Sequence, residues 1–234
     1  MGSGIAQIAA MAGNDVLLID RDEALVQRGI IGIGKQLARG VQKGRMTEEQ
    51  RALILERIVP KMDIADLDVQ IAIEAATENL ELKLDLFRRL DKATPKKAVL
   101  ASNTSSISIT TLGAATARAP RVIGMHFMNP VPVMALVEII RGIATSQETY
   151  DVTESLARDL GKTPVEVRDF PGFVSNRVLM PMINEAIYTL YEGVGSVESI
   201  DTVMKLGMNH PMGPLQLADF IGLDTCLAIM EVLY

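Results

Sequence analysis

The chain has 234 residues, a length that favours one or two domains. Hydrophobic residues make up 48% of it and charged residues 22%, which excludes wholesale disorder. The net charge is −6 and no basic stretch stands out, so a nucleic-acid partner is not expected. Its apolar runs are broken well before the ~18 residues that a membrane span needs. The single cysteine, Cys226, excludes an intrachain disulfide and favours a cytoplasmic location.

Short apolar runs that end at a polar residue recur along the first two thirds of the chain. They occupy residues 16–19, 71–73, 98–101, 122–125 and 164–167. Such runs are typical of buried parallel strands with functional carboxyl ends. Between them lie predicted helices at 3–12, 22–44, 47–57, 79–93 and 147–160, with Asn79 as an N-cap and a capping box from Thr47 to Gln50. This alternation predicts an α/β fold with a doubly wound parallel sheet.

The pattern changes near Asp169, beyond which the sequence predicts no further strand. Three helical stretches follow, at 176–192, 197–206 and 214–234, and glycines and prolines separate them. We therefore predict two domains. Residues 1–168 form the domain that contains the sheet, and residues 169–234 form an all-helical domain.

Both ends of the sequence fall inside predicted elements. The chain opens directly in a helix and closes at Tyr234 within an apolar helical run. In a doubly wound sheet the first strand is central and precedes the first helix. We therefore expect an apolar strand and a Gly-x-Gly-x turn upstream of Met1, and a helical continuation past Tyr234, so that both domains are incomplete.

The first helix and the first strand carry part of a dinucleotide-binding pattern. Gly2 and Gly4 open the helix, and Asp20 follows the strand, 18 residues after Gly2. In Rossmann domains the helix N-terminus holds the pyrophosphate, and an acid about 20 residues further on binds the ribose hydroxyls. Tight packing also explains small residues at a helix start, so both interpretations stay open. Arg21 could meet a 2′-phosphate, but Asp20 should repel one, which favours NAD over NADP.

Three blocks of polar residues lie further along the chain. Residues 102–106 read Ser-Asn-Thr-Ser-Ser, residues 126–132 read His-Phe-Met-Asn-Pro-Val-Pro, and residues 169–177 read Asp-Phe-Pro-Gly-Phe-Val-Ser-Asn-Arg. Glu138 lies twelve residues past the histidine. Together these blocks resemble the L-3-hydroxyacyl-CoA dehydrogenase family, and within it the bacterial 3-hydroxybutyryl-CoA dehydrogenases, over essentially the whole chain. The resemblance implies a Rossmann domain followed by a helical domain through which two subunits form a homodimer.

The resemblance implies four catalytic residues. His126 would be the general base that takes the proton of the substrate's 3-hydroxyl. Glu138 would orient the histidine ring and support the imidazolium that forms. Ser105 and Asn176 would hydrogen-bond the substrate oxygens near the reacting carbon, which places the site at the cleft between the two domains.

The resemblance also implies which residues hold the cofactor and the substrate. The cofactor-binding residues would be Gly2, Asp20, Glu78, Lys83 and Asn103, with the last three around the nicotinamide half of NAD. Lys43 would meet the phosphates of coenzyme A. Gln36 and Ala135 depart from the residues usual at the family's coenzyme A contacts. No metal is implied.

Each residue also has a plainer interpretation. His126 and Glu138 could be buried structural residues, and Ser105 or Asn176 could cap the helix that follows it. Lys43 could be an exposed helical lysine, and His210, in a turn rich in glycine and proline, is assigned no role.

The sequence therefore predicts an NAD-dependent oxidoreductase that interconverts short-chain (S)-3-hydroxyacyl-CoA and 3-ketoacyl-CoA such as acetoacetyl-CoA. Three alternatives stay open: a dehydrogenase of a free hydroxy acid or sugar acid, a non-catalytic structural relative, and a piece of a multifunctional chain. The helical cations favour the coenzyme A thioester; they are Lys35, Arg39, Lys43 and Arg45. The acyl-chain length and the direction of the reaction in the cell stay open.

Overall fold

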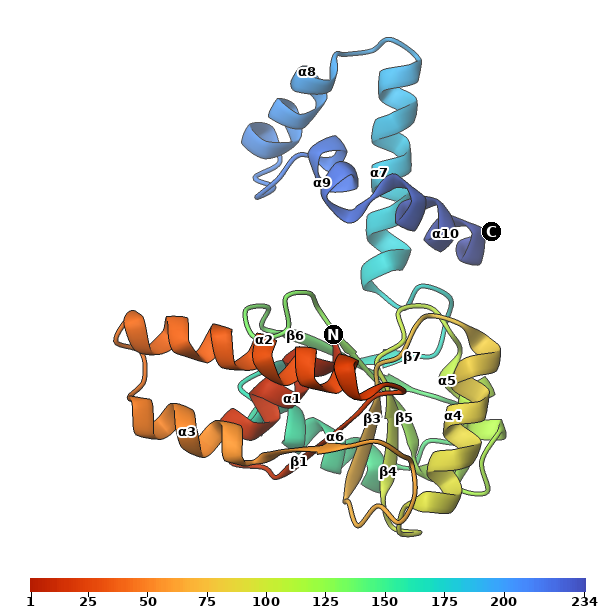
Figure 1. The fold of residues 1–234 in the computed structure, drawn as a ribbon. Coiled ribbons are helices and arrows are strands. Elements are labelled where there is room, and N and C mark those ends of the chain that lie inside the picture. The colour runs from red at the N-terminus through yellow and green to blue at the C-terminus, as the bar shows by residue number, and fades with distance from the viewer. The chain divides into compact units, whose positions relative to one another are not determined.

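The computed structural model describes residues 1–234 and divides them into two compact units, Met1–Asp169 and Phe170–Tyr234. The first unit contains every strand, and the second is entirely helical (Figure 1). None of the helices has both the length and the apolar composition needed to cross a membrane.

The first unit alternates strands and helices, as its sequence predicts. Its strands are β1 (Val16–Ile19), β2 (Ile58–Lys61), β3 (Ile71–Glu74), β4 (Val99–Ser102), β5 (Val122–Phe127), β6 (Leu136–Arg141) and β7 (Thr163–Arg168). Its helices are α1 (Gly2–Met11), α2 (Glu23–Gln42), α3 (Glu48–Glu56), α4 (Leu80–Ala93), α5 (Ile109–Ala114) and α6 (Gln147–Asp159), with a 3-10 turn at Ala119–Arg121. Each of the five predicted apolar runs coincides with a strand to within one residue at its start, and the α/β fold class is confirmed.

The strands form two sheets, and two of them, β2 and β6, were not among the predicted runs. β1 pairs in parallel with β2, and the second sheet has the order β3-β4-β5-β6-β7. β2 is absent from the predicted strands because it is a short edge strand that contains Pro60, a residue that weakens a strand pattern. β1 and β3 are not paired with each other, and the strand expected upstream of Met1 stays a prediction.

β6 runs antiparallel to β5, whereas every other neighbouring pair in the sheet is parallel. Only residues 128–135 connect β5 to β6. A parallel pair needs a crossover of about a dozen or more residues, so this connection permits only a hairpin. β6 was not among the predicted apolar runs, and the hairpin that it forms with β5 decides the geometry of the site described below.

Side-chain caps begin several helices at the expected residues. Thr47 and Gln50 form the predicted capping box at α3. Asn79 caps α4 by accepting a hydrogen bond from the Leu82 N–H at 2.9 Å. Such caps satisfy N–H groups that have no partner inside the helix, and each is worth about 1 kcal/mol.

Apolar residues from helices on both sides cover the larger sheet. Ile8 of α1 and Ala157 of α6 pack with Ile123 and Ile139 of the central strands in one buried cluster. α4 and α5 lie on the other side of these strands (Figure 1), where Phe87 is fully buried. The strands are thus buried on both faces, which is why they read as continuous apolar runs.

The second unit contains four α-helices and one π-helical turn. They are α7 (Ser175–Tyr191), α8 (Val197–Thr202), the π-helical turn Val203–Gly207, α9 (Pro214–Ile221) and α10 (Leu223–Leu233). The predicted single helix over 214–234 is two helices, because Gly222 between them has a φ of 100°. That conformation is open to glycine and interrupts a right-handed helix.

Candidate active site

His126 and Glu138 face each other across the β5–β6 hairpin. The antiparallel register pairs the two residues directly, so their side chains project from the same face of the sheet. His126 Nδ1 lies 2.8 Å from Glu138 Oε2, and both residues are buried, at 7% and 2% exposed. Because a carboxylate only accepts hydrogen bonds, this contact requires a proton on Nδ1. Nε2 is then the basic nitrogen of the neutral ring, which suits a general base.

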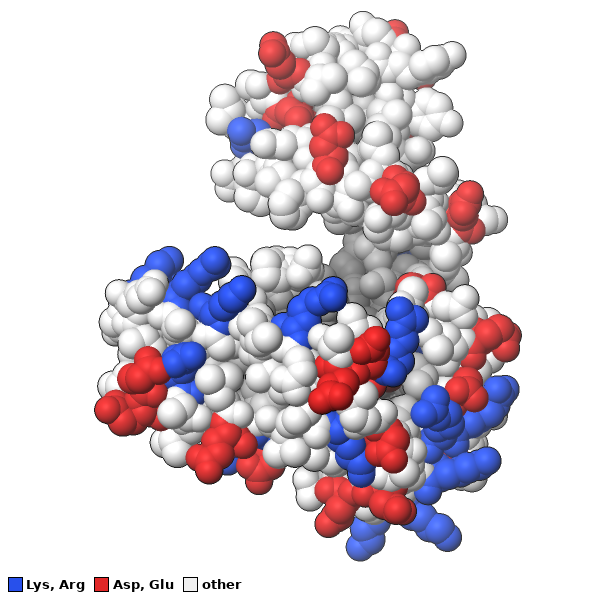
Figure 2. Space-filling view, in the orientation of Figure 1, with Lys and Arg blue, Asp and Glu red and all other residues white.

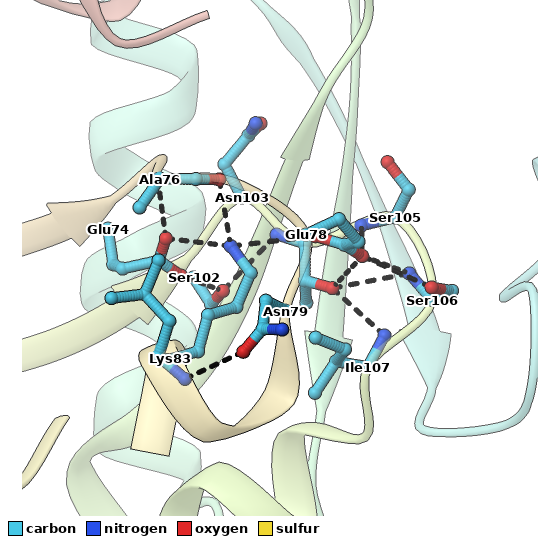
Figure 3. Close-up of polar contacts among 12 residues, drawn as sticks. Glu74, Ala76, Glu78, Asn79, Lys83, Ser102, Asn103, Ser105, Ser106 and Ile107 are labelled. Atoms are coloured by element: carbon cyan, nitrogen blue, oxygen red, sulfur yellow. Dashed lines mark hydrogen bonds and ion pairs between the residues drawn. The ribbon is translucent and has the colours of Figure 1, made fainter. Parts of the chain in front are cut away.

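Glu78 holds the loop that contains Ser105. Its Oε1 accepts hydrogen bonds from the backbone N–H groups of Ser105 and Ser106, at 2.9 and 3.1 Å, and from the hydroxyls of Thr104 and Ser106. Figure 3 shows the carboxylate between this loop and the buried ammonium of Lys83. Burial alone would raise the pKa of Glu78, but the Thr104 hydroxyl, the charge of Lys83 and the serine donors together lower it. Glu78 therefore stays ionised and fixes the position of the Ser105 backbone.

Lys83 and Glu74 form an ion pair in the interior below that loop. Lys83 Nζ lies 2.7 Å from Glu74 Oε1 and donates to the Ala76 carbonyl at 3.2 Å. Glu74 Oε2 accepts from the Ser102 hydroxyl at 2.6 Å, across the β3–β4 register. The side chains of Lys83 and Glu74 are only 1% and 2% exposed. The pair therefore joins the carboxyl ends of two strands to α4.

Glu74 was not among the predicted site residues. A carboxylate that ends a buried strand needs a partner, and this is the signal that points to it. The partner, Lys83, was predicted to contact the cofactor. In the structure its ammonium binds Glu74 and lies 3.5 Å from Glu78 Oε2. These three residues form one network, in which the Lys83 ammonium lies between the two carboxylates.

Asn103 links the ends of β4 and β5. Its side-chain Oδ1 accepts a hydrogen bond from the Phe127 N–H at 2.9 Å, and its backbone N–H donates to the Glu74 carbonyl at 2.7 Å. The bond to Phe127 fixes the orientation of the side-chain amide. The NH₂ group of Asn103 is therefore the part that can donate to a bound molecule.

The connection between β5 and β6 is held from two sides. Lys162 Nζ donates to the carbonyls of Val131 and Met134, at 2.5 and 2.8 Å. Burial lowers the pKa of Lys162. On the other side, a Cβ at Gly4 of α1 would lie 3.0 Å from Val131 Cβ, so only glycine fits there without a shift. Sequence reasoning missed Lys162, because nothing near it along the chain shows that it reaches this loop.

The N-terminus of α1 and Asp20 fit a dinucleotide. No side chain caps α1, so its first backbone N–H groups remain available to an anion. A Cβ at Gly2 would meet only Ala75 Cβ, at 3.8 Å, so packing does not require glycine there. A close approach of phosphate to the backbone is then the better reason for Gly2, whereas packing accounts for Gly4. Asp20 is exposed directly after β1, where an acid can bind ribose hydroxyls.

Two of the plainer interpretations are wrong. Ser105 does not cap the helix that follows it, because Ser108 caps α5 by accepting from the Thr111 N–H at 3.2 Å. Asn176 does not cap α7, which begins at Ser175 with Val174 in the N-cap position. Asn176 belongs to the helical unit, and the predicted site at a cleft between the domains stays a prediction.

Lys43 follows α2 directly and is exposed. It lies with three other exposed cations along and just beyond the second half of that helix: Lys35, Arg39 and Arg45. Figure 2 shows lysine and arginine side chains gathered over this end of α2. None of the four takes part in an ion pair, so their charges remain available to an anionic ligand.

The fold and the site together define a class of protein. A doubly wound sheet, an uncapped first helix, an acid after the next strand and a buried His–Glu pair are the parts of a nucleotide-dependent dehydrogenase. A scan against family models agrees: the NAD binding domain of 3-hydroxyacyl-CoA dehydrogenase matches residues 1–170, and the C-terminal domain of 3-hydroxyacyl-CoA dehydrogenase matches residues 172–234. The chain belongs to the 3-hydroxyacyl-CoA dehydrogenase family and is an NAD-dependent oxidoreductase.

Individual relatives agree with this family. The probable 3-hydroxybutyryl-CoA dehydrogenase of Bacillus subtilis is 58% identical over 235 residues, which cover 100% of this chain and 82% of that protein. The human mitochondrial hydroxyacyl-coenzyme A dehydrogenase is 43% identical, and the match covers 99% of this chain and 76% of the human protein. The crystal structure of (S)-3-hydroxybutyryl-CoA dehydrogenase PaaH1 from Ralstonia eutropha superimposes with a TM-score of 0.98 at 53% identity, and the match covers 100% and 83% of the two chains.

Proposed function

We propose that the protein interconverts short-chain (S)-3-hydroxyacyl-CoA and 3-ketoacyl-CoA, with His126 as the general base. The observation that carries this proposal is the buried contact between His126 Nδ1 and Glu138 Oε2. Bound NAD supplies the hydride acceptor. As the hydroxyl carbon loses hydride, His126 Nε2 takes the hydroxyl proton and the C–O bond becomes a carbonyl. Glu138 then stabilises the positive charge on the ring, which a well-placed carboxylate does in other acid–base pairs.

Ser105 and Asn176 complete the proposed site. Each carries a side-chain donor that can bind the substrate oxygen on which negative charge develops during reduction. The backbone of Ser105 is fixed by Glu78, so its hydroxyl starts from a defined position. In this proposal Gly2 and Asp20 bind the pyrophosphate and the adenosine ribose, and Glu78, Lys83 and Asn103 shape the nicotinamide end.

The thioester is favoured over a free acid by the cations along α2. A free hydroxy acid has one carboxylate, whereas coenzyme A has several phosphate charges. Four unpaired cations over one end of a helix, Lys43 among them, match the second ligand better. Salt screens interactions between such exposed charges, so affinity for the thioester should fall as ionic strength rises.

A comparison of two substrates tests the proposed function. We expect the protein to oxidise NADH with acetoacetyl-CoA and to have negligible activity with acetoacetate. The measurement is the steady-state kcat/KM for each substrate at matched ionic strength. A similar or higher kcat/KM for acetoacetate would overturn the thioester assignment, because the cations of α2 would then add nothing to recognition.

We also propose that the helical unit forms a homodimer and that the protein is cytoplasmic. Large apolar side chains of this unit are exposed, among them Tyr191 at 85%, Leu206 at 82% and Phe220 at 76%. Of the 23 lysines and arginines, only Arg177 and Lys205 lie beyond residue 169. Exposed apolar side chains with few lysines nearby are typical of a surface that a second subunit covers. Sedimentation velocity checks the proposed homodimer, and a monomer at micromolar concentration would contradict it.

A further inference from the structure

The first turn of α5 lies where the Ser105 loop meets the β5–β6 hairpin, which carries His126 and Glu138. It follows the Ser105 loop directly. A Cβ at Gly124, two residues before His126 in β5, would lie 3.0 Å from Ile109 Cδ1. A Cβ at Gly142, just after β6, would lie 3.1 Å from the Thr110 nitrogen. The first turn of α5 therefore packs directly against both strands of the His126–Glu138 hairpin, and these close contacts leave no space for it to move nearer to them.

One carboxylate, that of Asp169, holds this turn in place. Asp169 Oδ1 accepts from the Ile109 N–H at 3.0 Å, and Oδ2 accepts from the Thr110 N–H and the Ser108 hydroxyl, both at 2.7 Å. Asp169 itself follows β7, and its N–H donates to the Arg141 carbonyl at the end of β6. Charged acceptors at a helix N-terminus form strong hydrogen bonds and complement the helix dipole.

Two carboxylates thus hold opposite ends of the same loop. Glu78 binds residues 104–106, and Asp169 binds residues 108–110. From this geometry we infer that Asp169 is a positioning residue for catalysis: it sets where Ser105 stands relative to His126. The inference rests on the proposed function for the role of Ser105, whereas the contacts of Asp169 are independent of it.

The main test is Asp169→Asn, with Asp201→Asn as its matched control. Asparagine keeps the shape of the side chain, but its NH₂ group cannot accept from Thr110, so one N–H loses its partner. Asp201 has the same role elsewhere, accepting from the Leu215 and Gln216 N–H groups at 2.9 and 3.0 Å at the start of α9. We expect Asp169→Asn to lower kcat on the order of 10-fold with little change in the KM for NADH. Asp201→Asn should leave kcat unchanged.

A double-mutant cycle separates positioning from general destabilisation. If Asp169 acts through Ser105, Asp169→Asn should lower kcat no further once Ser105 is alanine. Effects that multiply in the double variant, or an unchanged kcat in Asp169→Asn, would overturn the inference. Ser108→Ala removes one of the three hydrogen bonds to Asp169 together with the cap that Ser108 gives to the Thr111 N–H, and it keeps the other two bonds to Asp169 if Asp169→Asn does not fold.

Amide hydrogen exchange provides a readout that needs no activity. Residues 105–110 should exchange faster in Asp169→Asn than in the unmodified protein, while Asp201→Asn leaves them unchanged. Unchanged exchange in Asp169→Asn would overturn the inference even if kcat falls in this variant. A protein inactive toward acetoacetyl-CoA, but with the expected exchange pattern, would contradict the proposed function and leave the Asp169 contact established.

Discussion

Replacing His126 with glutamine is expected to lower kcat by about 10²–10⁴, the usual worth of a positioned acid–base group. Glutamine can still hydrogen-bond Glu138, but it cannot take a proton from the substrate's hydroxyl. The loss should therefore fall on kcat, with KM for acetoacetyl-CoA and NADH changing little. Steady-state reduction of acetoacetyl-CoA by NADH measures both constants.

The other histidine of the chain, His210, provides the matched control. It lies in the loop before α9 of the helical unit, and His210→Gln should leave kcat unchanged. Glu138→Gln is the companion variant, because it keeps the shape of the partner and removes its charge. It too should reduce kcat more than KM. If His126→Gln keeps the full kcat, the protein uses another base and the proposed mechanism is wrong.

Replacing Lys83 with methionine is expected to lower the free energy of unfolding by about 3–5 kcal/mol. Methionine fills a similar volume but leaves the Glu74 carboxylate buried with no cation beside it. The charge of Glu78 also loses the ammonium 3.5 Å away. Chemical denaturation monitored by circular dichroism measures the loss.

Two controls show whether the loss comes from the unpaired charge. Adding Glu74→Gln to Lys83→Met removes the buried charge, so the double variant should recover much of the stability. The exposed pair between Arg158 and Glu154 in α6 is the surface counterpart, and Arg158→Met should cost less than about 1 kcal/mol. If Lys83→Met lowers the free energy of unfolding by no more than Arg158→Met does, the Glu74–Lys83 pair is solvated.

Local patterns in the sequence are enough to predict most helices and strands. The capping box at Thr47 and the N-cap at Asn79 act within a few residues, so they can be read without knowing the fold. The apolar run of β1 ends at the predicted residue for the same reason. Gly222 shows the limit of this approach, because the apolar pattern around it continues and only the backbone conformation divides the helix.

The candidate site was only partly predictable. His126, Glu138 and the 102–106 block were identified from the sequence, because polar residues after buried apolar runs are unusual and their order matches a family. Glu74 and Asp169 were not assigned roles, although both are held by several hydrogen bonds. The partners of Asp169 lie 59–61 residues away along the chain, so no local pattern identifies them. Glu74 binds Lys83 and Ser102, which lie 9 and 28 residues away, and only its place at the end of a buried strand points to it.

By itself, the sequence determined the α/β class and the change to an all-helical second part, because both depend on residue type and short-range spacing. Its resemblance to a family predicts His126 and Glu138 as an acid–base pair. Only the tertiary structure decided that β6 turns back on β5 and so places Glu138 opposite His126. It also decided that Lys83 pairs with Glu74 and that Asp169 holds α5. These contacts depend on strand register and on which chain segments become neighbours after folding, and burial then requires each charge to find a partner.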